Sequence, residues 1–403
     1  MNRNSIFPTY SPPDIRFTSG QGSWLTAANG RRYLDFIAGI SVNTLGHAHP
    51  ALVEALYTQA RSLWHLSNMF DVPGQSELAE RYCDLTFADR VFFTNSGGES
   101  VECALKSARR YHAANGRPDR IDVIGFEGAF HGRSYASVNA AGNPKYLEGF
   151  GPPLPGYVQA PFGDMDALTT LVGPNTAAIL IEPVQGEGGL RAAPPDYLEA
   201  IRRLCNEHSV LLIYDEVQCG AGRTGQLFAH QWSDKAAPDI MAVAKGVGGG
   251  FPLGMCLATE AVARHMTPGT HGTTYGGNAL AVAVGAAVLD QLLAAGFLES
   301  VRARSEQLRK GLDRLRDRYP ALIAEIRGKG LLTGFKMSGI TNTEMRDSLR
   351  DGGLLVGVAG DNVVRLAPPL NVRPEEIDEA IARLDSGLAR FDATGRPLAR
   401  THS

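Results

Sequence analysis

Short apolar runs recur along the chain, and each ends in polar or glycine-rich residues that precede a helical pattern. After VFFTN (91–95), Val101, Ala104, Leu105 and Ala108 fall at i, i+3, i+4 and i+7, which predicts an amphipathic helix. Further runs of this kind are DVIGF (122–126), AAILIEP (177–183), VLLIYDE (210–216) and DIMAVAK (239–245). Strands that are apolar throughout indicate burial on both faces, as in a parallel sheet covered by helices. We therefore expect functional groups beyond the carboxyl ends of these strands.

A different pattern begins after about residue 295, where a long amphipathic helix is followed by strand-like runs and a further helix. The runs are AEIRGKGLLTGFKM, LLVGVA and NVVRLAPPL, and the last helix lies in PEEIDEAIARLDSGLARF. This change predicts a smaller α/β domain over residues 296–403, after a large domain over residues 46–295. The turn-rich segment 1–45 is expected to pack with the small domain. The predicted fold class is α/β, with a mainly parallel central sheet flanked by helices in the large domain.

Composition narrows the possible functions. The 403 residues include 39 basic and 42 acidic side chains, a formal net charge of −3, so no electrostatic footprint for nucleic acid is present. The longest apolar runs fall short of the ~20 residues of a membrane-spanning helix, and the first residues lack the apolar region of a secretory signal. Five dispersed cysteines without CxxC spacing fit free thiols in a reducing compartment. We expect a cytoplasmic protein without nucleic-acid or membrane partners.

Lys245 lies where an apolar strand runs into glycines, in PDIMAVAKGVGGGFPLGM (238–255). A lysine at a strand end is often solvated, but few neighbours here suit a solvated charge. Partly apolar surroundings lower the pKa of a lysine, which suits a nucleophile that forms a Schiff base. Lys245 is therefore the first candidate for a catalytic residue.

Three other clusters follow strands or lie in glycine-rich turns. Asp215 and Glu216 end VLLIYDE, where they could serve as a metal site, a helix cap, a solvated corner or the partner of a pyridinium nitrogen. The SGG turn (96–98) precedes a helix whose first N–H groups could bind an anion. HGTTYGG (271–277) adds hydroxyl groups, although a plain turn explains it equally well. The histidines of GHAHP are too few for a zinc site, so no metal is expected.

In this order, the motifs resemble those of the class III (ω-amino acid) aminotransferases of fold type I, which depend on pyridoxal 5′-phosphate. The resemblance extends over nearly the whole chain. Its motifs are SGQGSWLTAANGRRYLDF, GHAHP, FFTNSGGES, FHGR, IEPVQGEGG, LLIYDEVQCGAGRTG, AKGVGGGFPLG and HGTTYGGN. Within the family, the motif sequences GHAHP, FHGR, QGEGG and HGTTYGGN are most similar to those of the N-acetylornithine aminotransferases.

The resemblance implies cofactor-binding roles for residues in these motifs. Lys245 would bond covalently to the cofactor and move the proton during the reaction. Asp215 would pair with the pyridine nitrogen, Gln218 would hydrogen-bond the ring hydroxyl, and Phe130 would stack on the ring. The phosphate would be bound by a second group of residues, which are Ser96, Gly97, Gly98 and, from the neighbouring subunit, Thr274. The active site would therefore belong to a homodimer.

The resemblance also implies how an amino donor and 2-oxoglutarate share one pocket. Arg365 would bind the α-carboxylate of 2-oxoglutarate, because an arginine can bind a carboxylate through two hydrogen bonds. Arg133 would bind the other carboxylate, or the α-carboxylate of acetylornithine. Glu187 would pair with Arg365 while the amine donor is bound and release it for the keto acid. Tyr10 and Thr273 complete the substrate-binding residues that the resemblance implies.

The predicted activity is transfer of the ω-amino group of N2-acetyl-L-ornithine to 2-oxoglutarate in arginine biosynthesis. Succinylornithine, succinyl-diaminopimelate, ornithine and 4-aminobutyrate remain alternative donors. Ile40 occupies a position where an ornithine-type relative carries a tyrosine, which argues against free ornithine. A nicotinamide-dependent oxidoreductase is the alternative outside the family, but the glycines of GVGGG lack the G-x-G-x-x-G spacing.

Overall fold

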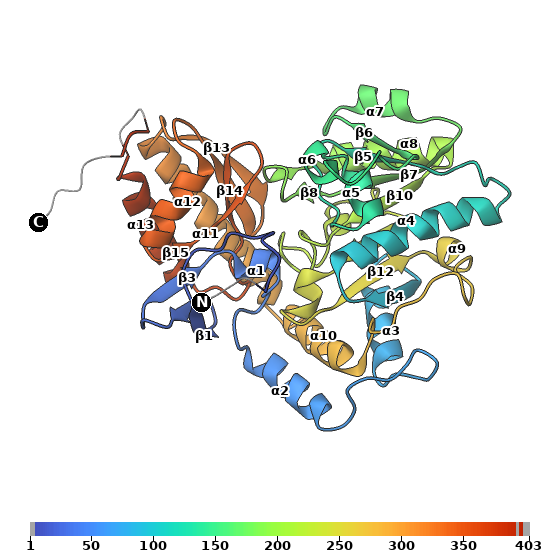
Figure 1. The fold of residues 1–403 in the computed structure, drawn as a ribbon, viewed down its shortest axis with the longest axis horizontal. Coiled ribbons are helices and arrows are strands. Elements are labelled where there is room, and N and C mark those ends of the chain that lie inside the picture. The colour runs from blue at the N-terminus through green and yellow to red at the C-terminus, as the bar shows by residue number, and fades with distance from the viewer. Residues whose placement is uncertain (1–4, 392–394, 398–403) are drawn as a thin grey trace, which may run out of the picture.

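The computed structural model describes residues 5–391 and 395–397, and its largest element is a seven-stranded sheet (Figure 1). The strand order is β4-β12-β11-β10-β7-β5-β6, and β12 alone runs antiparallel to the other strands of this sheet. The strands are β4 (Arg90–Thr94), β5 (Asp122–Phe126), β6 (Tyr157–Ala160), β7 (Thr176–Ile181), β10 (Leu211–Asp215), β11 (Ile240–Val243) and β12 (Gly254–Ala258). The predicted mainly parallel sheet is confirmed, with β12 as an antiparallel strand that the pattern did not reveal.

Both faces of this sheet are buried, which explains why its strands are apolar throughout. In β11, Met241 and Val243 join one buried cluster, whereas Ile240 and Ala242 join a second cluster on the other face. Helix α4 packs on β11 and β12, and α8 packs on β10. The helices of this part are α1 (Ala38–Ser41), α2 (Pro50–Ala60), α3 (Gln75–Leu85), α4 (Gly97–Ala114), α5 (Tyr135–Ala141), α6 (Pro144–Leu147), α7 (Met165–Leu171), α8 (Pro195–His208), α9 (Glu260–Ala263) and α10 (Ala279–Leu292), with short 3₁₀ helices η1 (Ala229–Trp232) and η2 (Lys245–Gly248).

A second, antiparallel sheet is built from the last third of the chain, with strand order β13-β14-β17-β16. Its strands are β13 (Ile323–Lys329), β14 (Leu332–Met337), β16 (Gly357–Ala359) and β17 (Val363–Leu366). Helices α11 (Phe297–Arg318), α12 (Asn342–Asp351) and α13 (Pro374–Leu388) pack beside it and on one another. Figure 1 shows this part beside the large sheet.

The N-terminal strands pair with the C-terminal part of the chain. β1 (Phe17–Gln21), β2 (Trp24–Ala27) and β3 (Arg32–Asp35) form a sheet whose fourth strand is β15 (Leu354–Leu355). After β7, strands β8 (Val184–Gln185) and β9 (Arg191–Ala192) pair as a two-stranded sheet, and the loop of residues 186–190 connects them. The predicted boundaries at residues 45 and 295 stay a prediction, and residues 1–4, 392–394 and 398–403 of the outer two parts lie outside the described residues.

Within the described chain, no single helix is both long and apolar enough to cross a bilayer. Helices α10 and α11 meet these criteria only as a pair, and they are bent by 70° relative to each other.

Candidate active site

A cleft of about 320 Å³ opens at the carboxyl ends of the central strands β7, β10 and β11. This volume lies within the range of small-molecule sites in proteins. Eight of the predicted site residues line the cleft, namely Ser96, Gly97, Gly98, Phe130, Glu187, Asp215, Gln218 and Lys245. The residues come from five separate stretches of sequence, and the parallel strands bring them to one edge of the sheet.

Lys245 begins the short helix η2, two residues after the end of β11. Its backbone φ is 49°, in the left-handed region that residues with a side chain adopt at a cost in free energy. Burial lowers the pKa of the Lys245 ammonium, although the carboxylate of Asp215 opposes this shift. A larger fraction of Lys245 is therefore neutral at a given pH, and a neutral amine is the form that acts as a nucleophile.

Asp215 is the last residue of β10, and its side chain is held by two hydrogen bonds. Its Oδ2 lies 2.7 Å from Nδ1 of His131, and its Oδ1 accepts the backbone N–H of Val217 at 3.0 Å. The residue is 4% exposed. The carboxyl group is therefore fixed in orientation within the cleft.

Glu216, the next residue, faces away from the cleft. Its carboxyl oxygens accept the backbone N–H groups of Ala229 and His230 at 2.5 and 3.0 Å. Burial raises the pKa of Glu216 to about 8. Of the two adjacent carboxyl groups, only that of Asp215 is available to a ligand. Among residues 5–391 and 395–397, no group of three or more His, Cys, Asp or Glu side chains is placed to hold a metal ion.

Glu182 is a third acidic group in the cleft, directly after β7, and it is 5% exposed. It accepts the backbone N–H of Phe130 at 3.0 Å. Burial and the nearby charge of Asp215 raise the pKa of Glu182 well above its usual value. Glu182 therefore keeps its proton to a higher pH than an exposed glutamate does. We call Glu182, Asp215 and Lys245 the floor of the cleft.

The turn before α4 forms a cradle at the end of the cleft. Ser96 caps the helix by accepting the backbone N–H of Glu99 at 3.3 Å, and the first N–H groups of a helix have no partner within it. A Cβ atom at residue 97 would lie 2.6 Å from the side chain of Val217, so the position requires glycine. Gly132 approaches Gly98 from the opposite side, where a Cβ atom on Gly132 would lie 3.0 Å from Cα of Gly98. This arrangement fits a phosphate group at the helix N-terminus.

Arg365 and Glu187 form an ion pair above the floor, with Nη1 of Arg365 2.5 Å from Oε1 of Glu187. Arg365 lies on β17 of the second sheet, whereas Glu187 lies in the loop between β8 and β9. Nη1 of Arg365 also donates to Oε1 of Gln218 at 3.4 Å. The pair therefore joins the second sheet to the loop between β8 and β9.

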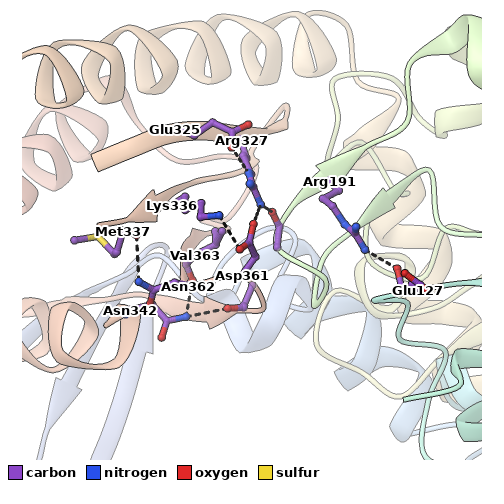
Figure 2. Close-up of polar contacts among 12 residues, drawn as sticks. Glu127, Arg191, Glu325, Arg327, Lys336, Met337, Asn342, Asp361, Asn362 and Val363 are labelled. Carbon is purple, nitrogen blue, oxygen red and sulfur yellow. Dashed lines mark hydrogen bonds and ion pairs between the residues drawn. The ribbon is translucent and has the colours of Figure 1, made fainter. Parts of the chain in front are cut away.

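The loop that carries Glu187 is held by the turn between β16 and β17. The N–H of Gly360 donates to the backbone oxygen of Glu187 at 2.7 Å. Figure 2 shows Arg327 and Lys336 pointing toward Asp361 in this turn, each with a nitrogen 2.7 Å from a carboxylate oxygen. We call Glu187, Arg327, Asp361 and Arg365 the rim of the cleft.

Besides Arg365, four predicted residues lie outside the cleft lining. Arg133 is exposed and lies over the ring of Tyr146 at 3.8 Å. Thr273 and Thr274 line a separate hollow of about 620 Å³, which reaches the cradle at Gly98. Tyr10 is 87% exposed in the segment before β1. The substrate and phosphate roles of these four residues stay predictions.

Sequence reasoning missed His131 and Glu182. Glu182 follows an apolar strand, as Asp215 does, so the rule that singled out Asp215 would also have found it. His131 is one residue of FHGR in a loop, and only the folded chain shows that it contacts Asp215. Its Nε2 is buried without a hydrogen-bond partner in the part of the chain that the structure describes.

Comparison with known proteins places this cleft in a family. The class III aminotransferase profile matches residues 7–388. An acetylornithine aminotransferase of Agrobacterium fabrum is 55% identical over 394 residues, which cover 98% of each chain. An ornithine aminotransferase structure from Toxoplasma gondii superposes with a TM-score of 0.92 at 33% identity, covering 96% of this chain and 93% of that one. An N-acetylornithine aminotransferase structure from Stenotrophomonas maltophilia has a TM-score of 0.83 at 37% identity, covering 94% of this chain and 97% of that one.

The similarity spans both sheets and the cleft between them. The matched region contains all of the floor and all of the rim. A buried lysine beside a fixed aspartate, with a phosphate cradle at a helix N-terminus, is the donor set that the family's cofactor requires. The chain therefore belongs to the class III aminotransferases, a family of pyridoxal-phosphate-dependent enzymes of fold type I.

Proposed function

We propose that the enzyme transfers the ω-amino group of N2-acetyl-L-ornithine to 2-oxoglutarate, giving N-acetylglutamate 5-semialdehyde and L-glutamate, as a step of arginine biosynthesis. The observation that carries the proposal is the cleft in which Lys245 and Asp215 lie below the Arg365–Glu187 pair. The relatives named acetylornithine aminotransferase, at 54–55% identity over nearly the full chain, support the choice of donor.

The described residues fit pyridoxal 5′-phosphate. Gly97 and Gly98 offer backbone N–H groups to its phosphate, Asp215 offers a carboxylate to its ring nitrogen, and Phe130 offers an aromatic face. When bound, the cofactor supplies an electron sink for the carbon that loses its proton. His131 fixes the orientation of the Asp215 carboxylate, which would face the ring nitrogen of the bound cofactor.

Lys245 is the group that carries the proton. Its lowered pKa lets Nζ accept a proton from the substrate carbon that bears the amine. The same nitrogen can then donate this proton to the carbon on the other side of the amine nitrogen. The raised pKa of Glu182 reduces the negative charge that this residue places beside Asp215. An amine with a lowered pKa can act as base and as acid in the two halves of a transamination.

The rim selects between the two substrates. The ω-amine donor brings a primary amine without an adjacent carboxylate, and Glu187 keeps Arg365 neutralised while that donor is bound. The keto acid brings an α-carboxylate, which competes with Glu187 for the guanidinium group of Arg365 through two hydrogen bonds. One pocket can then accept both partners in turn.

We further propose that the enzyme is a cytoplasmic homodimer. The hollow that Thr273 and Thr274 line adjoins Gly98 of the cradle, and Thr274 is exposed there. A second subunit placed against this hollow would receive the Thr274 hydroxyl at its own phosphate site.

The decisive experiment compares amino donors with 2-oxoglutarate as acceptor. We expect kcat/KM for N2-acetyl-L-ornithine to exceed that for ornithine by about 10-fold or more, because a small group at the end of a pocket is worth ~1–3 kcal/mol. Succinylornithine, succinyl-diaminopimelate and 4-aminobutyrate complete the panel. A higher kcat/KM for any of the other four donors would overturn the choice of acetylornithine and leave the class of enzyme intact.

A further inference from the structure

Arg223 is a buried arginine in the loop that follows β10. It is 2% exposed, and burial lowers its pKa to about 9, so the side chain still carries its charge at neutral pH. Across the part of the chain that the structure describes, no carboxylate pairs with this charge. A buried charge without a partner of opposite sign costs free energy unless hydrogen bonds compensate for it. The groups that accept hydrogen bonds from Arg223 therefore indicate what the residue does.

Both acceptors of the guanidinium group are backbone oxygens at the second sheet. Nη1 of Arg223 donates to the oxygen of Leu331 at 3.2 Å and also to the oxygen of Pro368. In return, the backbone oxygen of Arg223 accepts the N–H of Leu331 at 2.9 Å. A Cβ atom on Gly330 would collide with this same oxygen, so the two segments lie in close backbone contact. Arg223 thus fastens the loop after β10 to the second sheet.

The two acceptors lie at the ends of the strands that carry and flank Arg365. Leu331 directly precedes β14, and Pro368 is the second residue after β17. These strands are antiparallel neighbours, and Arg365 of β17 is the register partner of Gly334 of β14. The beginning of β14 and the end of β17 therefore lie at the same end of the sheet. Arg223 bridges the two strands at this end, close to Arg365 along the chain.

The loop that carries Arg223 begins at the floor of the cleft. Asp215 is the last residue of β10, and the loop starts directly after it. Within the loop, the N–H of Gly220 donates to the oxygen of Glu216 at 2.9 Å, and the N–H of Arg223 donates to the oxygen of Gly220 at 3.2 Å. One hydrogen-bonded loop therefore connects the Asp215 carboxyl group to the strands that hold Arg365.

A guanidinium group suits this bridging position. Nη1 carries two N–H bonds, so it can donate to carbonyl oxygens of two strands at once, and its charge strengthens both hydrogen bonds. Nη2 of Arg223 is buried and has no hydrogen-bond partner among residues 5–391 and 395–397. The compensation for the buried charge therefore comes from the two strand ends that Nη1 joins.

We propose that Arg223 is a positioning residue for the keto-acid substrate, because it holds the ends of β14 and β17 where Arg365 can reach the α-carboxylate of 2-oxoglutarate. The inference rests on the proposed function, in which Arg365 binds this carboxylate and Glu187 neutralises Arg365 while the amine donor is bound. Arg223 itself does not line the cleft. Its loss should therefore impair the half-reaction with the keto acid and spare the half-reaction with the amine donor.

Separate measurement of the two half-reactions tests this division in Arg223→Met. The holoenzyme is mixed first with the preferred donor of the panel alone, and its aminated form is then mixed with 2-oxoglutarate alone, with cofactor absorbance as the readout. We expect the second-order rate constant for 2-oxoglutarate to fall about tenfold or more, and that for the donor to stay within about twofold, because misplacement of a binding group by ~1 Å can cost up to ~100-fold. Equal losses in both half-reactions, or no loss in either, would overturn the proposal.

Arg120→Met is the matched control for loss of stability. Arg120 is also buried, and its guanidinium group donates to the backbone oxygens of His208 and Ser209 at the end of α8, at 3.0 and 2.5 Å. None of these three residues lines the cleft. This variant should lose thermal stability, as Arg223→Met does, and keep both half-reactions. A selective loss with 2-oxoglutarate in Arg120→Met would contradict the positioning role, because lower stability alone would then produce the effect.

Arg223→Lys keeps the test decisive if Arg223→Met does not fold. An ammonium group retains the charge and can donate to two oxygens. We expect a smaller loss than in Arg223→Met, again confined to the half-reaction with 2-oxoglutarate. A loss that Arg223→Lys shares equally between the two half-reactions would overturn the proposal.

Arg365→Met distinguishes failure of this inference from failure of the proposed function. It should lower the rate constant for 2-oxoglutarate more than Arg223→Met does. An effect in Arg365→Met without one in Arg223→Met would refute the positioning role and leave the proposed binding of the keto acid intact. No effect in either variant would refute the carboxylate site at Arg365, and the role of Arg223 with it.

Discussion

The floor and the rim of the cleft are built in different ways. Asp215 and Glu182 of the floor follow neighbouring parallel strands of one sheet and are 4% and 5% exposed. At the rim, Arg365 comes from the second sheet, and the side chains of Glu187 and Asp361 are 31% and 46% exposed. Strand register fixes the floor, whereas contacts between the second sheet and the loop of β8 and β9 fix the rim. We propose from this difference that the floor sets the reaction and that the rim selects which substrate enters it.

Removal of the Lys245 amine from the floor should lower the rate of the reaction more than any other change considered. Lys245→Ala eliminates the proton carrier, and loss of a general acid–base group costs about 10²–10⁴-fold in rate. We expect kcat to fall by at least this factor with every donor, as measured by glutamate formation under saturating substrates. Lys235→Ala, at an exposed position outside the cleft, should retain the original rate. A Lys245→Ala enzyme within tenfold of the original would contradict the assigned role.

Loss of the His131 side chain, which contacts Asp215 of the floor, should lower activity less than loss of Lys245. His131→Phe leaves Oδ2 of Asp215 without its hydrogen bond, and hydrogen bonds to charged groups are worth ~1.5–3 kcal/mol. We expect kcat to fall, or the dissociation constant of pyridoxal phosphate to rise, by about 10–100-fold. Equilibrium dialysis against the cofactor distinguishes the two effects. His131→Asn, whose amide can donate to the carboxylate, should recover part of the loss, and equal defects in the two variants would argue against a positioning role.

A change at the rim should alter selectivity more than rate. Glu187→Ala removes the carboxylate that neutralises Arg365, so α-amino acids should gain access to the guanidinium group. We expect the ratio of kcat/KM for acetylornithine to that for L-glutamate as donors to fall about tenfold, equivalent to ~1.4 kcal/mol. Glu325→Ala is the control, because Glu325 is an exposed carboxylate that contacts Arg327 and not Arg365. An unchanged ratio in Glu187→Ala would mean that Glu187 does not discriminate between the donors.

The smallest effect is expected at the outer ion pairs of the rim. Asp361→Asn loses the pairs with Lys336 and Arg327 but keeps a residue that tolerates the φ of 54° at this position. Exposed ion pairs contribute about 0–1 kcal/mol each, so urea unfolding should detect a loss of about 1 kcal/mol or less. The donor ratio should stay within twofold, because the backbone bond from Gly360 to Glu187 remains.

The pH dependence of this small loss has a definite sign. The hydrogen bond from Lys336, together with Arg327, lowers the pKa of Asp361. The contribution of Asp361 to stability is therefore present above the usual carboxyl pKa of 3.8, and it disappears as the pH falls through the lowered value. The original enzyme and Asp361→Asn should thus converge in stability in strong acid. A difference that grew on acidification would contradict the assigned ion pairs.

The sequence predicts Asp215 and Lys245 of the floor because strand ends are visible in it, although Glu182 was missed. An apolar run followed by Asp215, and another followed by Lys245, need only the rule that parallel strands end at one edge. Strand β12 was not among the predicted strands, and its antiparallel direction has no signal in the sequence, since its residues GMCLA are all buried, as those of a parallel strand are. An apolar pattern reports burial and carries no information on strand direction.

The rim, and the contact of His131 with Asp215, depend on residues that lie far apart in the chain. Arg365 and Glu187 were assigned through family resemblance, and no local pattern indicates that Gly360 holds the Glu187 loop. The contact of His131 with Asp215 joins residues 84 positions apart. Such partners become visible only when the chain has folded.

The pairing of β3 with β15 has a consequence for synthesis of the protein. Leu34 and Leu354 are register partners, although 320 residues separate them. At a translation rate of ~5–20 residues per second, the three antiparallel strands β1, β2 and β3 are synthesised on the order of 15–60 s before β15, the fourth strand of their sheet. During that interval β3 presents an unpaired edge, which is open to pairing with other nascent chains. Slowing of elongation between these two leucines should therefore lower the yield of folded protein, even though the finished enzyme is unchanged.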